Sequence, residues 1–148
     1  MKKLLIIALM LCSASLVAQK DGVGVGIISG FPNTGLSIKK FVDKNAFDIV
    51  AAWDLSENDN DGTFFIAWID YLFHNYMFDR QLPWYVGAGA AIGFGNNFNL
   101  GARGVLGITY IFDWPFDVFV EIGPMLELLP ETETRWGGGA GFRFYIGD

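Results

Sequence analysis

NLGARGVLGITYIFDWPFDVFVEIGPMLEL, residues 99–128, is the stretch that decides the fold. Apolar side chains occupy every second position over residues 100–112 and again over residues 116–122, on either side of a tight turn at Asp113-Trp114-Pro115. A period of two is that of a β-strand, in which successive side chains point to opposite faces. The stretch therefore predicts two long strands joined as a hairpin.

The second face of these strands carries glycines together with Arg103, Asp117 and Glu121. An unbroken apolar face opposite glycines and charges does not fit the packed interior of a soluble β-sandwich. It is the inverted pattern of a transmembrane β-barrel, which is apolar toward lipid and polar toward its lumen.

The same alternation recurs along the chain and predicts about eight strands. They are residues 21–30, 35–41, 46–55, 63 to about 77, 84–94, 99–112, 116–129 and 134–146. An even number of strands places both termini at one side of the membrane, and an eight-stranded barrel is just wide enough to be filled by side chains. The predicted fold is all-β, an eight-stranded antiparallel up-and-down transmembrane β-barrel.

The first residues read as a secretory signal peptide, with Lys2-Lys3 before an apolar run and small residues up to Ala18. We expect residues 1–18 to be this signal and residues 19–148 to form the barrel. Cys12 suggests the alternative of a lipoprotein anchor, but Leu11 precedes it, where such signals prefer a small residue. Without Cys12 the chain has no cysteine for a disulfide or for thiol catalysis.

Charge and hydropathy exclude several classes of protein. Without the signal peptide, eight Lys and Arg stand against 16 Asp and Glu, and a net charge of −8 repels nucleic acid. Hydrophobic residues make up 52% of the chain, yet after the signal no run reaches the roughly 20 apolar residues of a spanning helix. A membrane protein built from strands accounts for both observations.

Lys39 and Lys40 are neighbours in a predicted strand, so they cannot both point inward. We expect Lys39 to lie inside and Lys40 to extend to the membrane interface. Six aromatic residues near strand ends are expected in two interfacial girdles: Trp53, Trp84, Phe112, Trp114, Phe116 and Phe144. Pro124 breaks the pattern and is expected at a bulge or above the bilayer.

The whole chain after the signal resembles the small outer-membrane barrels of Gram-negative bacteria, the OmpA/OmpX-like class. The segments GAGAAIGFG and FVEIGPMLELLPETE resemble an uncharacterised barrel family of Bacteroidota and spirochaetes. Gly139, Phe142 and Phe144 are similar to the C-terminal signal that such barrels present to the outer-membrane insertion machinery. The chain departs from that signal at Gly137, where a polar residue is preferred, and continues past the aromatic to Asp148.

This resemblance implies a porin-like protein of the cell envelope, located in the outer membrane. It implies a monomer whose partners are outer-membrane lipid, lipopolysaccharide and the insertion machinery.

Two motifs point weakly to ligands. Residues 87–93 resemble a dinucleotide-binding turn, but the Gly95-Asn96-Asn97 that follows does not start the helix such a turn requires. Glu57, Asp59 and Asp61 have the spacing of calcium ligands, but the twelfth position is Trp68 instead of Glu. We expect no cofactor and no metal, with a weak surface cation site in this loop as the alternative to a solvated loop.

His74 raises the question of catalysis, because some small barrels are lipid-modifying hydrolases with a histidine and serine pair. The serines outside the signal are Ser29, Ser37 and Ser56, and none follows His74 on its strand. We therefore expect no enzyme, and we expect His74 to be interfacial.

Inward-facing charges form the best candidate site: Lys39, Asp48, Asp70, Arg103, Glu121, Glu127 and Arg143. A last hairpin centred near residue 132 would place Glu121 opposite Arg143. A third hairpin connection centred near residue 59 would place Asp48 opposite Asp70, and Arg103 would approach Glu127 diagonally. Paired charges would plug the barrel, because unpaired buried charge is costly; the alternative is a narrow polar path.

These observations favour a barrel with a filled lumen and a structural or surface-interaction role through its outer loops. The first alternative is a narrow channel or transporter for a small solute. The second is a lipid-modifying outer-membrane enzyme.

Overall fold

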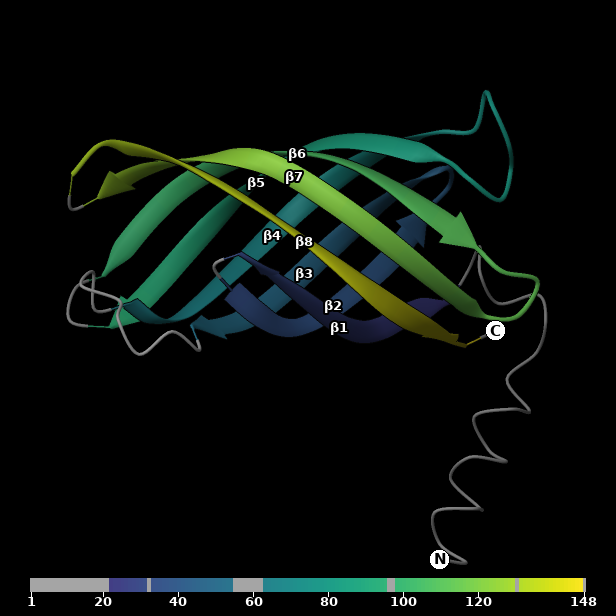
Figure 1. The fold of residues 1–148 in the computed structure, drawn as a ribbon, viewed down its shortest axis with the longest axis horizontal. Helices are drawn as coiled ribbons and strands as arrows, with labels where there is room; N and C mark the ends of the chain where they lie inside the picture. Colours follow the sequence, from purple (N-terminus) through teal and green to yellow (C-terminus); the bar gives the residue numbers. More distant parts are fainter. Residues whose placement is uncertain (1–21, 32, 55–62, 96–97, 130, 148) are drawn as a thin grey trace, which may run out of the picture.

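The computed structural model describes residues 22–31, 33–54, 63–95, 98–129 and 131–147. Its elements are β1 (Val23–Phe31), β2 (Asn33–Val42), β3 (Asn45–Asp54), β4 (Thr63–Asn75), β5 (Trp84–Gly95), β6 (Asn99–Ile111), β7 (Phe116–Leu129) and β8 (Glu133–Ile146). Each strand pairs antiparallel with the next, and β1 pairs with β8, so the sheet closes into a barrel (Figure 1). The prediction of an all-β, eight-stranded antiparallel barrel is confirmed. Within the described residues, no helix has the length and apolarity needed to cross a membrane.

The barrel has two distinct ends. We call the end where β1 begins and β8 ends the terminus end; it also carries the connections after β2, β4 and β6. The opposite end carries the connections after β1, β3, β5 and β7, and lies to the left in Figure 1. The predicted cation loop with Glu57, Asp59 and Asp61 lies outside the described residues, as does the predicted signal peptide at 1–18.

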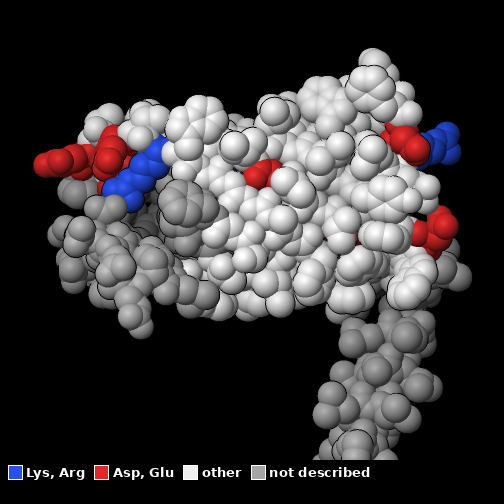
Figure 2. Space-filling view, in the orientation of Figure 1, with Lys and Arg blue, Asp and Glu red and all other residues white. Residues whose placement is uncertain are grey.

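Side chains alternate between the interior and the outer face along every strand. On β2, Lys39 is fully buried and Lys40 is exposed, as predicted. The outer face carries exposed Leu, Ile, Val and Phe side chains on every strand, among them Leu106, Val120 and Phe73. Figure 2 shows one face of the barrel, where Lys, Arg, Asp and Glu gather at the two ends and the surface between them is uncharged apart from one acidic residue.

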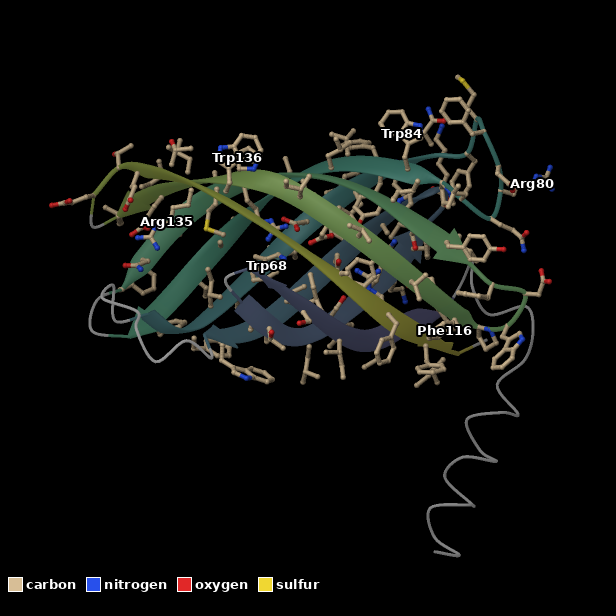
Figure 3. All side chains as sticks on the ribbon, in the orientation of Figure 1. Trp68, Arg80, Trp84, Phe116, Arg135 and Trp136 are labelled. Carbon is tan, nitrogen blue, oxygen red and sulfur yellow. The ribbon has the colours of Figure 1, made fainter. Side chains whose placement is uncertain are left out.

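Aromatic side chains gather on the outer face near both ends (Figure 3). Near the terminus end, the ring centroids of Tyr110 and Phe112 lie 4.8 Å apart along the end of β6, and those of Phe116 and Phe144 lie 4.8 Å apart between β7 and β8. Near the opposite end Phe94 contacts Phe65 and Phe98, and Trp53 and Trp136 are exposed. Trp114, in the connection after β6, is exposed at the terminus end.

Glycine lets strands and interior side chains approach closely. A Cβ on Gly26 would lie 1.7 Å from the carbonyl oxygen of Phe142 on β8, and a Cβ on Gly107 would lie 2.2 Å from the ring of Tyr85. The interior of a narrow barrel therefore needs glycine at these positions to hold its large side chains.

Pro124 lies within β7 and is exposed on the outer face, and its ring lies 3.7 Å from the position of a Cβ on Gly104. The β6–β7 ladder pairs Arg103 with Met125 and resumes at Leu106 with Ile122, so the proline sits where the ladder has no assigned pair. The register shift of this strand pair lies at Leu100 and Gly101, away from the proline. Proline has no N–H to donate, which explains the local gap.

Candidate functional site: a buried charge cluster beneath a cavity

Arg143 on β8 is the centre of the buried charge cluster. Its Nη2 lies 2.6 Å from Asp48 Oδ2, its Nη1 lies 3.6 Å from Asp117 Oδ1, and its Nε donates to Ser37 Oγ at 2.8 Å. Ser37 in turn donates to Asp48 Oδ1 at 2.9 Å. The guanidinium also stacks over the ring of Phe119, with Cζ 3.6 Å from the centroid. Arg143 has no exposed surface, so these partners must replace its hydration.

Arg103 on β6 holds a second group of charges. Its Nε lies 3.1 Å from Asp70 Oδ2 and its Nη2 lies 3.3 Å from Glu121 Oε1. The guanidinium lies over the indole of Trp68, with Cζ 4.6 Å from the centroid. Tyr85 donates from its hydroxyl to Glu121 Oε2 at 2.9 Å, and this bond links the group to the aromatic interior of the terminus end.

The terminus end of the interior is filled by aromatic rings around a lysine and a histidine. Lys39 Nζ lies 2.9 Å from His74 Nε2 and 4.8 Å from the ring centroid of Phe41. Tyr145 donates its hydroxyl to Asp117 Oδ2. His74 is buried in the interior, and its inward parity on β4 brings it to Lys39 on β2. The expectation that it lies at a membrane interface stays a prediction.

The predicted pairing of Glu121 with Arg143 is wrong. Arg143 lies opposite Asp117 in the register, and Glu121 lies opposite Gly139. The β7–β8 hairpin is centred near residue 130 instead of 132, which shifts the register by four residues. A shift by an even number keeps every side chain on its face but changes its level in the barrel.

The predicted register between Asp48 and Asp70 is correct. Two carboxylates directly opposite each other would repel, but Asp48 binds Arg143 and Asp70 binds Arg103.

At the opposite end, Glu127 lies opposite Glu133 and Arg135 bridges them, with its Nε 3.7 Å from Glu127 and its Nη2 3.2 Å from Glu133. The ion pairs of Arg103 run to Asp70 and Glu121 instead of to Glu127.

The structure adds members that the candidate set lacks: Ser37, Tyr85, Asp117, Arg135 and Tyr145. All have inward parity on their strands, and this parity is the sequence signal that could have found them.

Of the C-terminal motif, Gly139 faces the interior, and Phe142 and Phe144 face outward on β8. Within the described ranges, no group of three His, Cys, Asp or Glu side chains is placed to hold a metal ion.

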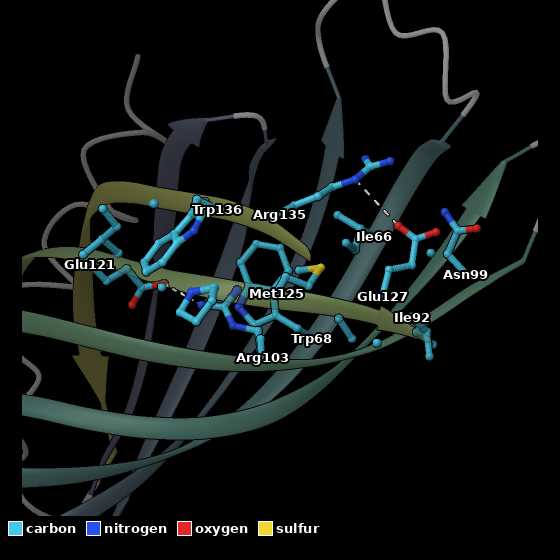
Figure 4. A pocket seen from close by; sticks show the side chains of 18 of the residues that line it. Ile66, Trp68, Ile92, Asn99, Arg103, Glu121, Met125, Glu127, Arg135 and Trp136 are labelled. Atoms are coloured by element: carbon cyan, nitrogen blue, oxygen red, sulfur yellow. Dashed lines mark hydrogen bonds and ion pairs between the residues drawn. The ribbon is translucent and has the colours of Figure 1, made fainter. Parts of the chain in front are cut away.

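A cavity of about 120 Å³ lies above the Arg103 group, toward the opposite end of the barrel (Figure 4). Its charged lining comes from Arg103, Glu121, Glu127 and Arg135. Its apolar lining includes Ile28, Ile66, Trp68, Ala91 and Met125. Glycines from β5 to β8 also line it, and the absence of side chains there leaves the space open: Gly93, Gly101, Gly123, Gly137 and Gly138.

The fold and site define a closed eight-stranded antiparallel barrel with a charge cluster inside it and a small cavity above the cluster. Comparisons with known proteins give no match: no family model, no curated protein sequence and no solved structure matches this chain. What the chain does must therefore be argued from its own residues.

Proposed function

We propose that this chain is an integral outer-membrane β-barrel with a closed interior and a structural or surface-interaction role through the connections at its opposite end. The observation that carries the proposal is the inverted distribution of side chains. Large apolar side chains are exposed around the outer face, whereas Lys39, Asp48, Asp117 and Arg143 have almost no exposed surface.

A soluble monomer rarely exposes a continuous apolar patch larger than a few hundred Å², and such a patch marks a partner or a membrane. Here Leu106, Val120 and Ile122, from two adjacent strands, are each more than half exposed. Burial of that surface in lipid would stabilise the protein by about 25 cal/mol per Å². The aromatic side chains near both ends agree with the two interfacial belts of a membrane barrel.

The closed interior favours this role over that of a channel. Arg143, Tyr85, Tyr145 and Lys39 are among the largest fully buried side chains, and they lie across the terminus half of the interior. Each has polar or aromatic partners that hold it in place. An ion would have to break these contacts to pass.

Planar-bilayer recording of the protein tests the proposal. The wild type should insert without unitary conductance steps, whereas D48A/R143A, which removes the central ion pair, should give measurable steps and prove that insertion occurs in the assay. A matched control, E133A/R135A, alters the exposed pair at the opposite end and should remain silent. Conductance of the wild type would support the channel, and recovery of the protein as a soluble periplasmic monomer would reject the membrane assignment.

The lipid-modifying alternative has its own test, which is release of fatty acid from lipopolysaccharide. We expect none, because His74 Nε2 faces Lys39, and Ser37 bonds Asp48 and Arg143.

A further inference from the structure

The cavity above the charge cluster has a built floor and apolar walls. Arg103 and Glu121 form the charged floor, and they are held by their ion pair and by the bonds to Asp70 and Tyr85. Trp68 and Met125 supply flat and flexible apolar surface beside it (Figure 4). A hollow with apolar walls and a few fixed polar groups is the usual form of a small-molecule site.

One residue that lines this cavity, Trp68, carries a buried donor without a protein partner. The indole Nε1 of Trp68 is buried and makes no hydrogen bond with the described residues, and Trp68 as a whole is only 6% exposed. A buried N–H is costly unless something accepts from it. Water can do so, and a ligand that enters the cavity must provide an acceptor of equal quality in its place.

The charges around the cavity argue for a neutral ligand. Arg103 is already bound by Asp70 and Glu121, and Arg135 by Glu127 and Glu133. The lining holds two guanidinium groups, of Arg103 and Arg135, and two carboxylates, of Glu121 and Glu127, so an anionic ligand would meet no net positive charge. A cationic ligand that offers no acceptor could not receive the hydrogen bond of the Trp68 N–H.

The size of the cavity limits the ligand further. An engineered apolar cavity of about 150 Å³ holds one benzene molecule, so about 120 Å³ suits a single ring or a branched chain of similar size.

We propose that this cavity binds a small neutral molecule with an apolar body and one hydrogen-bond acceptor, to which Trp68 Nε1 donates. The apolar body packs on Trp68, Ile66 and Met125. This binding site goes beyond the proposed structural role and does not depend on it, since binding is measured on the barrel in detergent whatever its role in the membrane.

The test compares two probes of matched size, cyclohexanone, which has an acceptor, and methylcyclohexane, which has none. Both are titrated into the detergent-solubilised protein, and the indole N–H signals of its five tryptophans are followed by NMR. W68F identifies the Trp68 signal by its loss and removes the donor. W53F is the matched control, because Trp53 is exposed on the outer face and does not line the cavity. The titration is repeated in a detergent with a longer alkyl chain.

Cyclohexanone should shift the Trp68 N–H signal downfield with saturation, and methylcyclohexane should not. Binding of cyclohexanone, measured by calorimetry, should be about five- to tenfold weaker in W68F, as expected for the loss of one hydrogen bond, and unchanged in W53F. Equal affinity for the two probes, or an N–H signal that follows the detergent and ignores the probe, would overturn the proposal. The comparison of probes on the wild type keeps the test decisive even if W68F fails to fold.

Discussion

Arg143 and Asp48 should show strong energetic coupling, because their ion pair, at 2.6 Å, is the shortest among the described residues and both side chains are almost fully buried. R143M leaves Asp48 and Asp117 without their shared cation, whereas D48N leaves Arg143 with Asp117 at 3.6 Å. Breaking a buried pair by removing one partner costs about 3–5 kcal/mol. We therefore expect R143M near the upper end of that range and D48N near the lower end.

The double variant D48N/R143M should be more stable than the sum of the single effects by about 2 kcal/mol, since it removes both charges together. Urea unfolding in detergent, followed by tryptophan fluorescence, measures all three free energies. The exposed pair of Arg135 and Glu133 is the control, and its coupling should stay below about 0.5 kcal/mol. Additive effects at Asp48 and Arg143 would mean that water screens the interior, and would refute the proposal that the interior is closed.

Three further predictions concern the walls of the barrel. L106R should lose about 2–4 kcal/mol in lipid vesicles, because Leu106 lies on the outer face in the middle of β6, and equal stability to wild type would contradict its lipid exposure. G26A should lose more than about 2 kcal/mol, since its Cβ would clash with the backbone of β8, whereas G104A meets only ordinary contacts at 3.7 Å and should unfold near the wild-type urea concentration. Y85F removes a hydrogen bond to Glu121 and should cost about 1–3 kcal/mol in the same unfolding assay; no loss would show that Glu121 is hydrated.

Sequence alternation predicted the number of strands and the facing of their side chains, because a one-residue error would move charges to the apolar face. It could not predict the register of β7 against β8, since a shift of four residues leaves every side chain on its face. The pairing of Glu121 with Arg143 failed for that reason, although both residues lie inside as expected.

Contacts across the barrel could not be predicted from the sequence either. Lys39 meets His74 from a strand two positions away, and Arg143 meets Asp48 across the interior from β8 to β3. These contacts depend on the curvature and tilt of the closed sheet, which alternation does not encode. The cavity depends in turn on several inward glycines at one level of the barrel, and this level follows from the register.

Quenching of single tryptophans by brominated phospholipids tests the central claim most directly. Trp136 is 65% exposed on the outer face and Trp68 is buried inside the barrel. In lipid vesicles, a variant that keeps only Trp136 should be strongly quenched, and one that keeps only Trp68 should be nearly unaffected. Equal quenching of the two, or none of either, would contradict a barrel that is apolar toward lipid and closed around its charges.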